Sequence, residues 1–120
     1  MVGMNIQSEQ LGTLLATLLR FRDERNWARF HSPKNLAAAI SIEAAEISEI
    51  FLWSTEAESY SVAQDAHAAL QSELADVFIY LLYLANEVNV DLIAAATKKV
   101  QQNEMRFPVA SSPDFHESHR

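Results

Sequence analysis

Hydrophobic side chains recur every three or four residues along most of the 120-residue chain. This spacing gathers them on one face of an α-helix. It predicts four helices, over about residues 8–28, 33–53, 64–87 and 92–105. Only two glycines and three prolines occur, too few for a turn-rich β protein. We therefore expect an all-α fold built as a four-helix bundle.

Local signals mark the start of the second helix and of a helical turn in the connection that follows it. Ser32 followed by Pro33 is typical of an N-cap and the first helical position after it. Thr55 and Glu58 have the spacing of a capping box, in which each side chain accepts a hydrogen bond from the other residue's backbone. The connection over residues 54–63 is therefore expected to contain a short helical turn.

The second and third helices are apolar on more than one side, most clearly over residues 74–85. A helix of that kind is buried against several neighbours. Four helices offer few neighbours within one chain, so we expect a homodimer or homotetramer whose assembly completes the core. We expect one domain over residues 1–109, followed by a flexible polar tail over residues 110–120.

The chain carries a net charge of −7 and no cysteine. The negative charge argues against a protein that binds nucleic-acid backbones, and the lack of cysteine excludes disulfides and thiolate metal sites. Residues 1–10 lack the basic start and apolar run of a signal peptide, and the apolar run over residues 77–85 is too short to cross a membrane. We expect a cytoplasmic protein with no membrane partner.

Two acidic pairs stand inside the apolar second and third helices. Glu43 with Glu46, and Glu73 with Asp76, are three residues apart, so each pair lies on one face of its helix. Two such helices can bring these carboxylates together, at a high cost in free energy unless cations neutralise them. Oxygen ligands favour hard divalent cations, so the pairs predict a Mg²⁺ site, with Mn²⁺ as the other candidate.

A solvated acidic stripe is the simpler interpretation of one such pair. Against it, no basic residue occurs between Lys34 and Lys98, whereas a solvated helix usually carries salt-bridge partners for its acids. A di-iron site would use a Glu-x-x-His pair, and neither motif contains histidine. Glu49 extends the first pair, and either Glu46 or Glu49 is a candidate for the carboxylate that orients or deprotonates a water.

Two further groups each have two interpretations. Lys99, Asn103 and Arg106 share one helical face, which fits either cations at a helix C-terminus or a clamp for phosphate oxygens. A group of aromatic and histidine side chains lies beside predicted turns and brackets the acidic helix, which fits either core packing or a slot in which a base stacks. These residues are Trp27, Phe30, His31 and Trp53.

The sequence Glu43-x-x-Glu46, followed by 26 residues and then Glu73-x-x-Asp76, resembles the signature of the MazG-like all-α nucleoside triphosphate pyrophosphohydrolases. Further stretches are similar to the dCTP pyrophosphatase branch of that family. They are residues 21–31, 33–36, 51–53, 76–81 and 103–109. The segment after Val109 departs from the family pattern, so nothing is inferred from it.

The resemblance implies Mg²⁺-dependent hydrolysis of a nucleoside triphosphate to the monophosphate and pyrophosphate, in nucleotide-pool cleansing. It implies that the four paired acids bind metal and that other matching residues contact base, sugar and phosphates. These residues are Trp27, Phe30, His31, Asn35, Trp53, Tyr80, Lys99, Asn103 and Arg106. The expected substrate is dCTP or a modified dCTP. The alternatives are the same reaction on dUTP, dATP or a non-standard nucleotide, and a non-catalytic helical interaction module.

Overall fold

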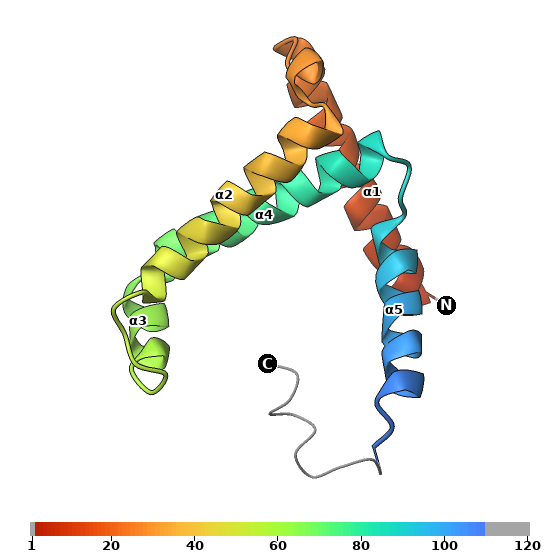
Figure 1. Cartoon of the computed structure of the whole chain (residues 1–120). Coiled ribbons are helices and arrows are strands. Elements are labelled where there is room, and N and C mark those ends of the chain that lie inside the picture. The colour runs from red at the N-terminus through yellow and green to blue at the C-terminus, as the bar shows by residue number, and fades with distance from the viewer. Residues whose placement is uncertain (1, 110–120) are drawn as a thin grey trace. The chain divides into compact units, whose positions relative to one another are not determined.

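The computed structural model of the chain describes residues 2–109, in which all regular secondary structure is helical (Figure 1). The elements are α1 (Val2–Glu24), a 3-10 turn η1 (Ala28–Phe30), α2 (Pro33–Phe51), α3 (Ser59–Asp65), α4 (His67–Glu87) and α5 (Leu92–Arg106). No strand occurs within the described residues. The all-α prediction is therefore confirmed, with α3 as an additional short helix in the connection where one helical turn was expected.

The chain divides into two compact units, residues 1–89 and residues 90–120. The first unit holds α1 to α4, and the second unit holds α5. The single domain expected over residues 1–109 stays a prediction. The expected tail over residues 110–120 lies outside the described residues.

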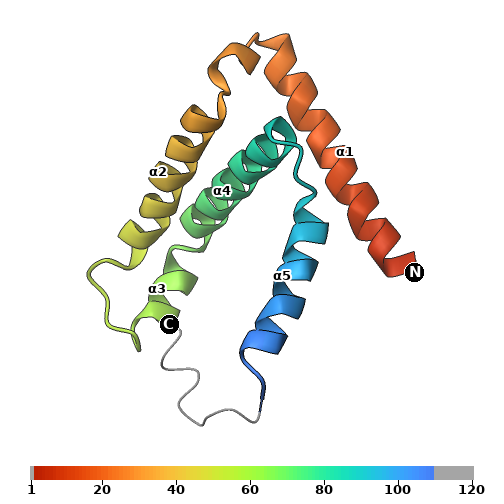
Figure 2. The same ribbon diagram turned by 45° about the vertical axis from the view of Figure 1, so that its right-hand side comes forward.

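The first unit is organised around α2 and α4, which run side by side in opposite directions (Figures 1 and 2). α1 packs on α4, and α3 contacts both α2 and α4. The most buried apolar side chains come from three of these helices. They are Leu18, Leu36, Leu82, Tyr83 and Ala85. The paired helices α2 and α4 are thus the frame on which any site in this unit is built.

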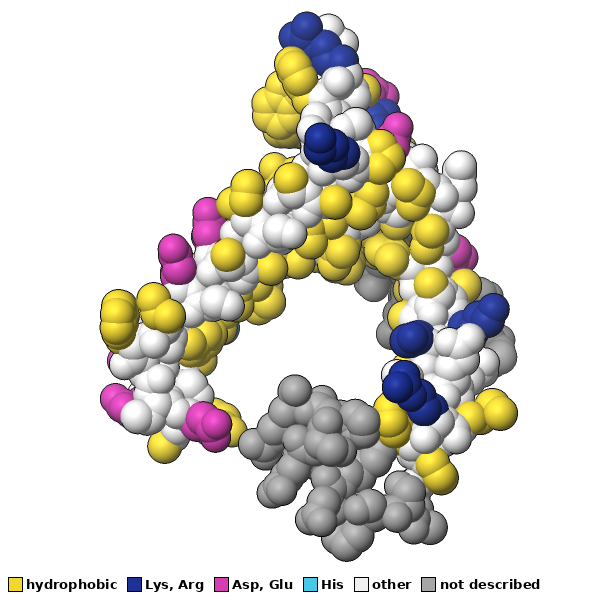
Figure 3. Space-filling view, in the orientation of Figure 1, with side chains coloured by type: hydrophobic (Ala, Val, Ile, Leu, Met, Phe, Trp, Pro, Cys, Tyr) yellow, Lys and Arg dark blue, Asp and Glu magenta, His cyan; other side chains and the backbone are white. Residues whose placement is uncertain are grey.

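A large part of the apolar surface of α2 and α4 is not covered within the first unit. Figure 3 shows hydrophobic side chains gathered along one edge of this helix pair. Ile42 is 60% exposed on α2, and Leu74 and Phe78 are 53% and 44% exposed on α4. Leu74 and Phe78 are four residues apart and share a face of their helix. The apolar character noted in the sequence is therefore present as open surface, and the homo-oligomer stays a prediction.

By length and composition, α4 is the one helix within residues 2–109 that is able to cross a membrane. The core helix of a globular protein passes the same test, so this is weak evidence. α4 packs against α2 and carries three carboxylates, Glu73, Asp76 and Glu87, which are costly inside a bilayer. These features fit a core helix.

The expected caps at the start of α2 and before α3 are both present. The Ser32 hydroxyl accepts a hydrogen bond from the Asn35 backbone N–H at 3.2 Å, with Pro33 as the first helical residue. The Thr55 hydroxyl accepts from the Glu58 N–H at 3.1 Å, and the Glu58 carboxylate accepts from the Thr55 N–H at 3.3 Å. The capping box predicted from the sequence is confirmed.

The predicted end of the first helix at residue 28 is wrong, since α1 ends at Glu24. Asn26 adopts a left-handed conformation with φ of 55°. The Trp27 N–H donates to the Arg22 carbonyl at 2.9 Å, and the Asn26 N–H donates to the Asp23 carbonyl at 3.1 Å. This is the Schellman arrangement of a helix C-terminus, in which asparagine replaces the usual glycine. The start predicted for the third helix, residue 64, is also wrong, because Gln64 belongs to α3 and α4 begins at His67.

The left-handed residue gives a test of this helix end. Asn26→Gly is expected to keep the free energy of unfolding within about 0.5 kcal/mol of wild type, because glycine adopts this conformation without steric strain. Asn26→Val is expected to lower it by about 1–2 kcal/mol, because a β-branched side chain is strained at positive φ. Urea unfolding of the three proteins measures both values. Equal losses in the two variants would show that backbone conformation is not what Asn26 supplies.

Candidate functional site

Three of the paired acids converge where α2 and α4 face each other. Glu43 comes from the middle of α2, and Glu73 and Asp76 come from the first half of α4. One carboxylate oxygen of each lies within 4.8 Å of the other two, and all three side chains are half-buried. The antiparallel packing of the two helices therefore brings together acids that are about thirty residues apart in the chain.

These carboxylates lack the partners that would stabilise their charge. The Oε2 atoms of Glu43 and Glu73 are both buried, with no hydrogen-bond partner. Burial raises the pKa of Glu43, and the negative charges of Glu46 and Asp76 raise it further. The pKa of Glu73 is raised to about 7, first by its hydrogen bond to Glu46 and then by burial. Both carboxyl groups therefore hold their protons more tightly than ordinary surface acids do.

A divalent cation bound between these carboxylates would stabilise their charged forms. It would neutralise the clustered charge and coordinate the oxygens that no protein group contacts. The donors are carboxylate oxygens alone, a set that suits hard cations better than soft ones. The cluster of Glu43, Glu73 and Asp76 therefore fits a divalent metal site.

The structure distinguishes the two carboxylates between which the sequence could not choose. Glu46 is half-buried and close enough to Glu73 to share a proton with it. Glu49, almost one turn further along α2, is exposed and is not part of the cluster. Glu46 therefore adjoins the candidate metal site, whereas Glu49 does not.

A pocket of about 250 Å³ opens at the end of the α2–α4 pair where α1 passes into α2. Its lining is aromatic on one side, with a few polar groups. The lining residues are Trp27, Phe30, His31, Asn35, Leu36, Ala39 and Tyr80. The Asn35 side-chain amide donates to the Phe30 carbonyl at 3.0 Å, which fixes that side chain against the turn. Five residues of the predicted substrate group thus line one pocket, together with Leu36 and Ala39.

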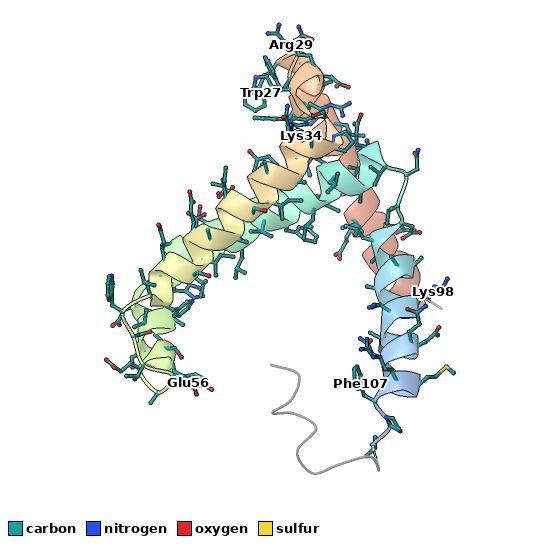
Figure 4. All side chains as sticks on the ribbon, viewed as in Figure 1. Trp27, Arg29, Lys34, Glu56, Lys98 and Phe107 are labelled. Carbon is teal, nitrogen blue, oxygen red and sulfur yellow. The ribbon has the colours of Figure 1, made fainter. Side chains whose placement is uncertain are left out.

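The Trp27 ring packs against Phe21 of α1. The Schellman arrangement directs the chain so that Trp27 lies beside the junction of α1 and α2 (Figure 4). Its ring meets the Phe21 ring edge-on, with centroids 5.4 Å apart. The Arg25 guanidinium lies 3.6 Å above the centroid of the Phe21 ring. These contacts order an indole that is itself 44% exposed and free to contact a ligand on its open side.

The pocket and the carboxylates are neighbours on both helices. Ala39 lines the pocket and Glu43 lies one turn further along α2; Tyr80 lines the pocket and Asp76 lies one turn earlier on α4. One turn is a distance of about 6 Å along a helix axis. A flat ring held in the pocket would therefore lie within the length of a short phosphate chain from the metal site.

The remaining predicted residues lie elsewhere. Trp53 follows the C-terminal end of α2, is 92% exposed and does not line the pocket. Lys99, Asn103 and Arg106 lie on α5 in the second unit and are exposed, and their role as a phosphate clamp stays a prediction. Leu36 and Ala39 were missed. For Ala39, the signal was its position one turn before Glu43.

The profile of the MazG-like family matches residues 38–118 of the sequence. The chain belongs to the MazG-like family. The matched region includes both acidic pairs and the Tyr80 side of the pocket. It begins after Trp27, Phe30 and His31, so these pocket residues are outside the match.

Two curated relatives are dCTP pyrophosphatase 1 of Rattus norvegicus and of Homo sapiens. The rat protein is 44% identical over 91 residues, which are 74% of this chain and 54% of the relative. The human protein is 42% identical over 90 residues, which are 73% of this chain and 53% of the relative. The chain thus spans about half the length of these relatives. A crystal structure of a pyrophosphatase from Archaeoglobus fulgidus is also similar, with a TM-score of 0.81 and 41% identity over 82% of this chain and 93% of that one.

The raised pKa of Glu73 gives this MazG-like chain a characteristic response to pH. Between pH 4.5 and about 7 the unfolded chain loses the proton and the folded chain keeps it, so without metal this group lowers the free energy of unfolding as pH rises. Mg²⁺ needs the ionised carboxylates, so its stabilising effect is expected to be larger at about pH 8 than at about pH 5. Thermal unfolding with a chelator and with Mg²⁺ at both pH values measures the effect.

Two glutamine variants serve as matched controls for this measurement. Glu73→Gln is expected to lose most of the stabilisation by Mg²⁺ at both pH values, and with it most of the difference between them, because one ligand of the cluster is gone. Glu49→Gln removes an exposed acid on α2 and is expected to keep the wild-type response. A Mg²⁺ response that is equal at the two pH values in the wild-type chain would contradict the assignment.

Proposed function

We propose that this protein is a Mg²⁺-dependent nucleoside triphosphate pyrophosphohydrolase that converts dCTP or a modified dCTP to the monophosphate and pyrophosphate. The proposal includes a role in nucleotide-pool cleansing in the cytoplasm. The observation that carries it is the position of the aromatic pocket one helical turn from the carboxylate cluster on both α2 and α4. A metal site alone would fit many functions, and a pocket for a flat ring beside it fits a nucleotide.

In this proposal, the pocket residues bind the base and sugar, and the carboxylates further along the helix pair bind the metal. Trp27, Phe30 and Tyr80 offer aromatic surface on which a base and sugar can pack. Glu43, Glu73 and Asp76, with Glu46 beside them, would hold Mg²⁺. When bound, the metal supplies the positive charge that polarises phosphate oxygens and stabilises a pyrophosphate leaving group.

Glu46 is the carboxylate that we assign to the attacking water. It lies beside Glu73 and Glu43 without being one of the three clustered acids, which places a carboxylate at the edge of the candidate metal site. A carboxylate in that position can orient a water towards the α-phosphorus and accept its proton. Cleavage then occurs between the α- and β-phosphates and releases pyrophosphate.

The choice of dCTP rests on the relatives named dCTP pyrophosphatase, which share 42–44% of aligned residues with this chain. The pocket is compact, at about 250 Å³, and the sequence stretches that flank it are among those that resemble this branch. Hydrolysis of dUTP, dATP or a non-standard nucleotide is the competing function, and comparison of kcat/KM across these nucleotides separates them.

Incubation of the full chain with dCTP and Mg²⁺ tests the reaction directly. The expected products are dCMP and pyrophosphate, separated by ion-exchange chromatography. Glu43→Gln and Glu46→Gln are each expected to lower kcat by at least about 100-fold, because one removes a metal ligand and the other removes the proton acceptor. Glu49→Gln, on the same helix, is expected to stay within about twofold of wild type. Release of orthophosphate, or loss of activity in the Glu49 variant alone, would refute the mechanism.

Trp53 leads to a proposal about assembly. α2 contains 19 residues, a length of about 28 Å, with the Trp27 pocket at one end and Trp53 beyond the other. One chain therefore does not place both indoles around one ligand. We propose a homodimer or homotetramer in which the open apolar face of α2 and α4 is covered by a second copy running antiparallel. Its Trp53 then reaches this copy's pocket.

Mixed oligomers test whether a partner supplies Trp53. Trp53→Ala and Glu43→Gln are each expected to be nearly inactive as pure proteins. In a co-refolded equal mixture of dimers, about half of the molecules are mixed, and one of their two sites has both an intact metal cluster and the partner's intact Trp53. The activity expected is about a quarter of wild type. If the mixture stays as inactive as its components, Trp53 does not act across subunits.

A further inference from the structure

Tyr83 is a buried tyrosine that connects α4 to α1 behind the pocket. Its side chain lies among the core residues at 5% exposure. Its hydroxyl donates a hydrogen bond to the backbone carbonyl of Leu18 at 2.7 Å, between residues 65 positions apart. Leu18 is itself buried on α1. A polar group is thus placed in the core with its one donor satisfied, which fixes the position of the phenol ring.

The Tyr83 ring supports the imidazole of His31. The two rings meet edge-to-face, with centroids 4.6 Å apart and an angle of 62° between their planes. His31 lines the pocket, whereas Tyr83 does not. Tyr83 therefore lies behind a pocket residue and restricts the positions that its ring can adopt.

The surroundings of His31 keep its ring neutral. Burial lowers its pKa, the Arg22 guanidinium on α1 lowers it further, and Glu87 on α4 opposes this in part. Arg22 and Glu87 also lie 3.9 Å apart as an ion pair, so each reduces the effect of the other. Because the ordinary pKa of 6.5 is already below neutrality, a lowered pKa leaves the imidazole uncharged at pH 7.

The buried nitrogen of His31 indicates which tautomer is present. Nδ1 is buried and has no hydrogen-bond partner. A buried N–H without an acceptor is rarer in folded proteins than an unsatisfied acceptor. The proton is therefore assigned to Nε2, which makes His31 a neutral hydrogen-bond donor in the pocket lining.

We propose that Tyr83 is a positioning residue for base recognition, which holds His31 so that its Nε2–H donates to a carbonyl oxygen of a pyrimidine base. This inference rests on the proposed function, since it assumes that the pocket receives the base. Cytosine offers such a carbonyl, and adenine has none. Tyr83 would then contribute to selection of the base without touching it.

Two substitutions at Tyr83 separate its ring from its hydroxyl. Tyr83→Phe keeps the ring against His31 and removes the hydrogen bond to Leu18. Tyr83→Leu removes the ring and admits water to the imidazole. Tyr60→Leu, at an 80% exposed position on α3, is the matched control for loss of an aromatic side chain.

The first measurement is an NMR titration of the His31 imidazole in the metal-free full chain. Wild type and Tyr83→Phe are expected to titrate below 6.5, and Tyr83→Leu is expected to shift up towards 6.5 because desolvation is relieved. Tyr60→Leu is expected to match wild type. This measurement does not depend on hydrolysis, so it tests the Tyr83 contact even if the proposed reaction proves wrong.

The second measurement is the kinetics of dCTP and dATP hydrolysis below the unfolding temperature. Tyr83→Phe is expected to raise KM for dCTP about fivefold and Tyr83→Leu about tenfold or more, with kcat unchanged in both. The preference for dCTP over dATP is expected to fall by the same factors. A loss of kcat at constant KM, or a His31 titration that is the same in Tyr83→Leu as in wild type, would overturn the proposal.

Discussion

The close approach of Glu43 to Glu73 and Asp76 is the constraint on which the rest of this structure depends. Two helices with largely apolar surfaces would pack equally well in several registers, but only some registers bring these carboxylates within 4.8 Å. The cost of that approach is visible in two buried oxygens without partners and in the raised pKa of Glu73. A cation that binds these oxygens would favour this register over the others, and metal binding and helix packing would then stabilise each other.

α4 connects every part of the site in the first unit. Glu73, Asp76, Tyr80 and Tyr83 are spaced by three, four and three residues, so they follow one stripe of the helix. The first two contribute to the metal cluster, Tyr80 lines the pocket, and Tyr83 supports His31 and is bonded to α1. A rigid helix fixes the distances between these groups. Displacement of α4 along α2 would therefore disturb the carboxylate cluster and the aromatic pocket together.

The sequence predicted what depends on periodicity and local chemistry. Helical spacing predicted the all-α class. The Ser32-Pro33 pair predicted the start of α2, and the spacing of Thr55 and Glu58 predicted the capping box. The end of α1 was missed because it depends on the left-handed backbone conformation of Asn26, and an asparagine in the sequence does not by itself predict that conformation. The carboxylate pairs were recognised as a set, but burial was needed to separate Glu46 from Glu49. Tyr83 was missed because its role depends on a contact with a residue 65 positions away.

The proposed assembly would explain two features together: the exposed apolar side chains of α2 and α4, and the position of Trp53 beyond the end of α2 that is far from the pocket. An amphipathic helix pair that exposes Leu74 and Phe78 leaves apolar surface in water, which a second copy would remove at a gain of roughly 25 cal/mol for each Å² covered. If the two-fold axis of such a pair is perpendicular to α2, the two copies of α2 run antiparallel, and the end that carries Trp53 would approach the partner's end that carries Trp27. In the proposed assembly, the contact that buries the apolar face would also add an aromatic side chain to each open pocket. Assembly and completion of the pocket would then be consequences of one interface, because Trp27 and Trp53 lie near opposite ends of α2 and one chain cannot bring both to the same pocket.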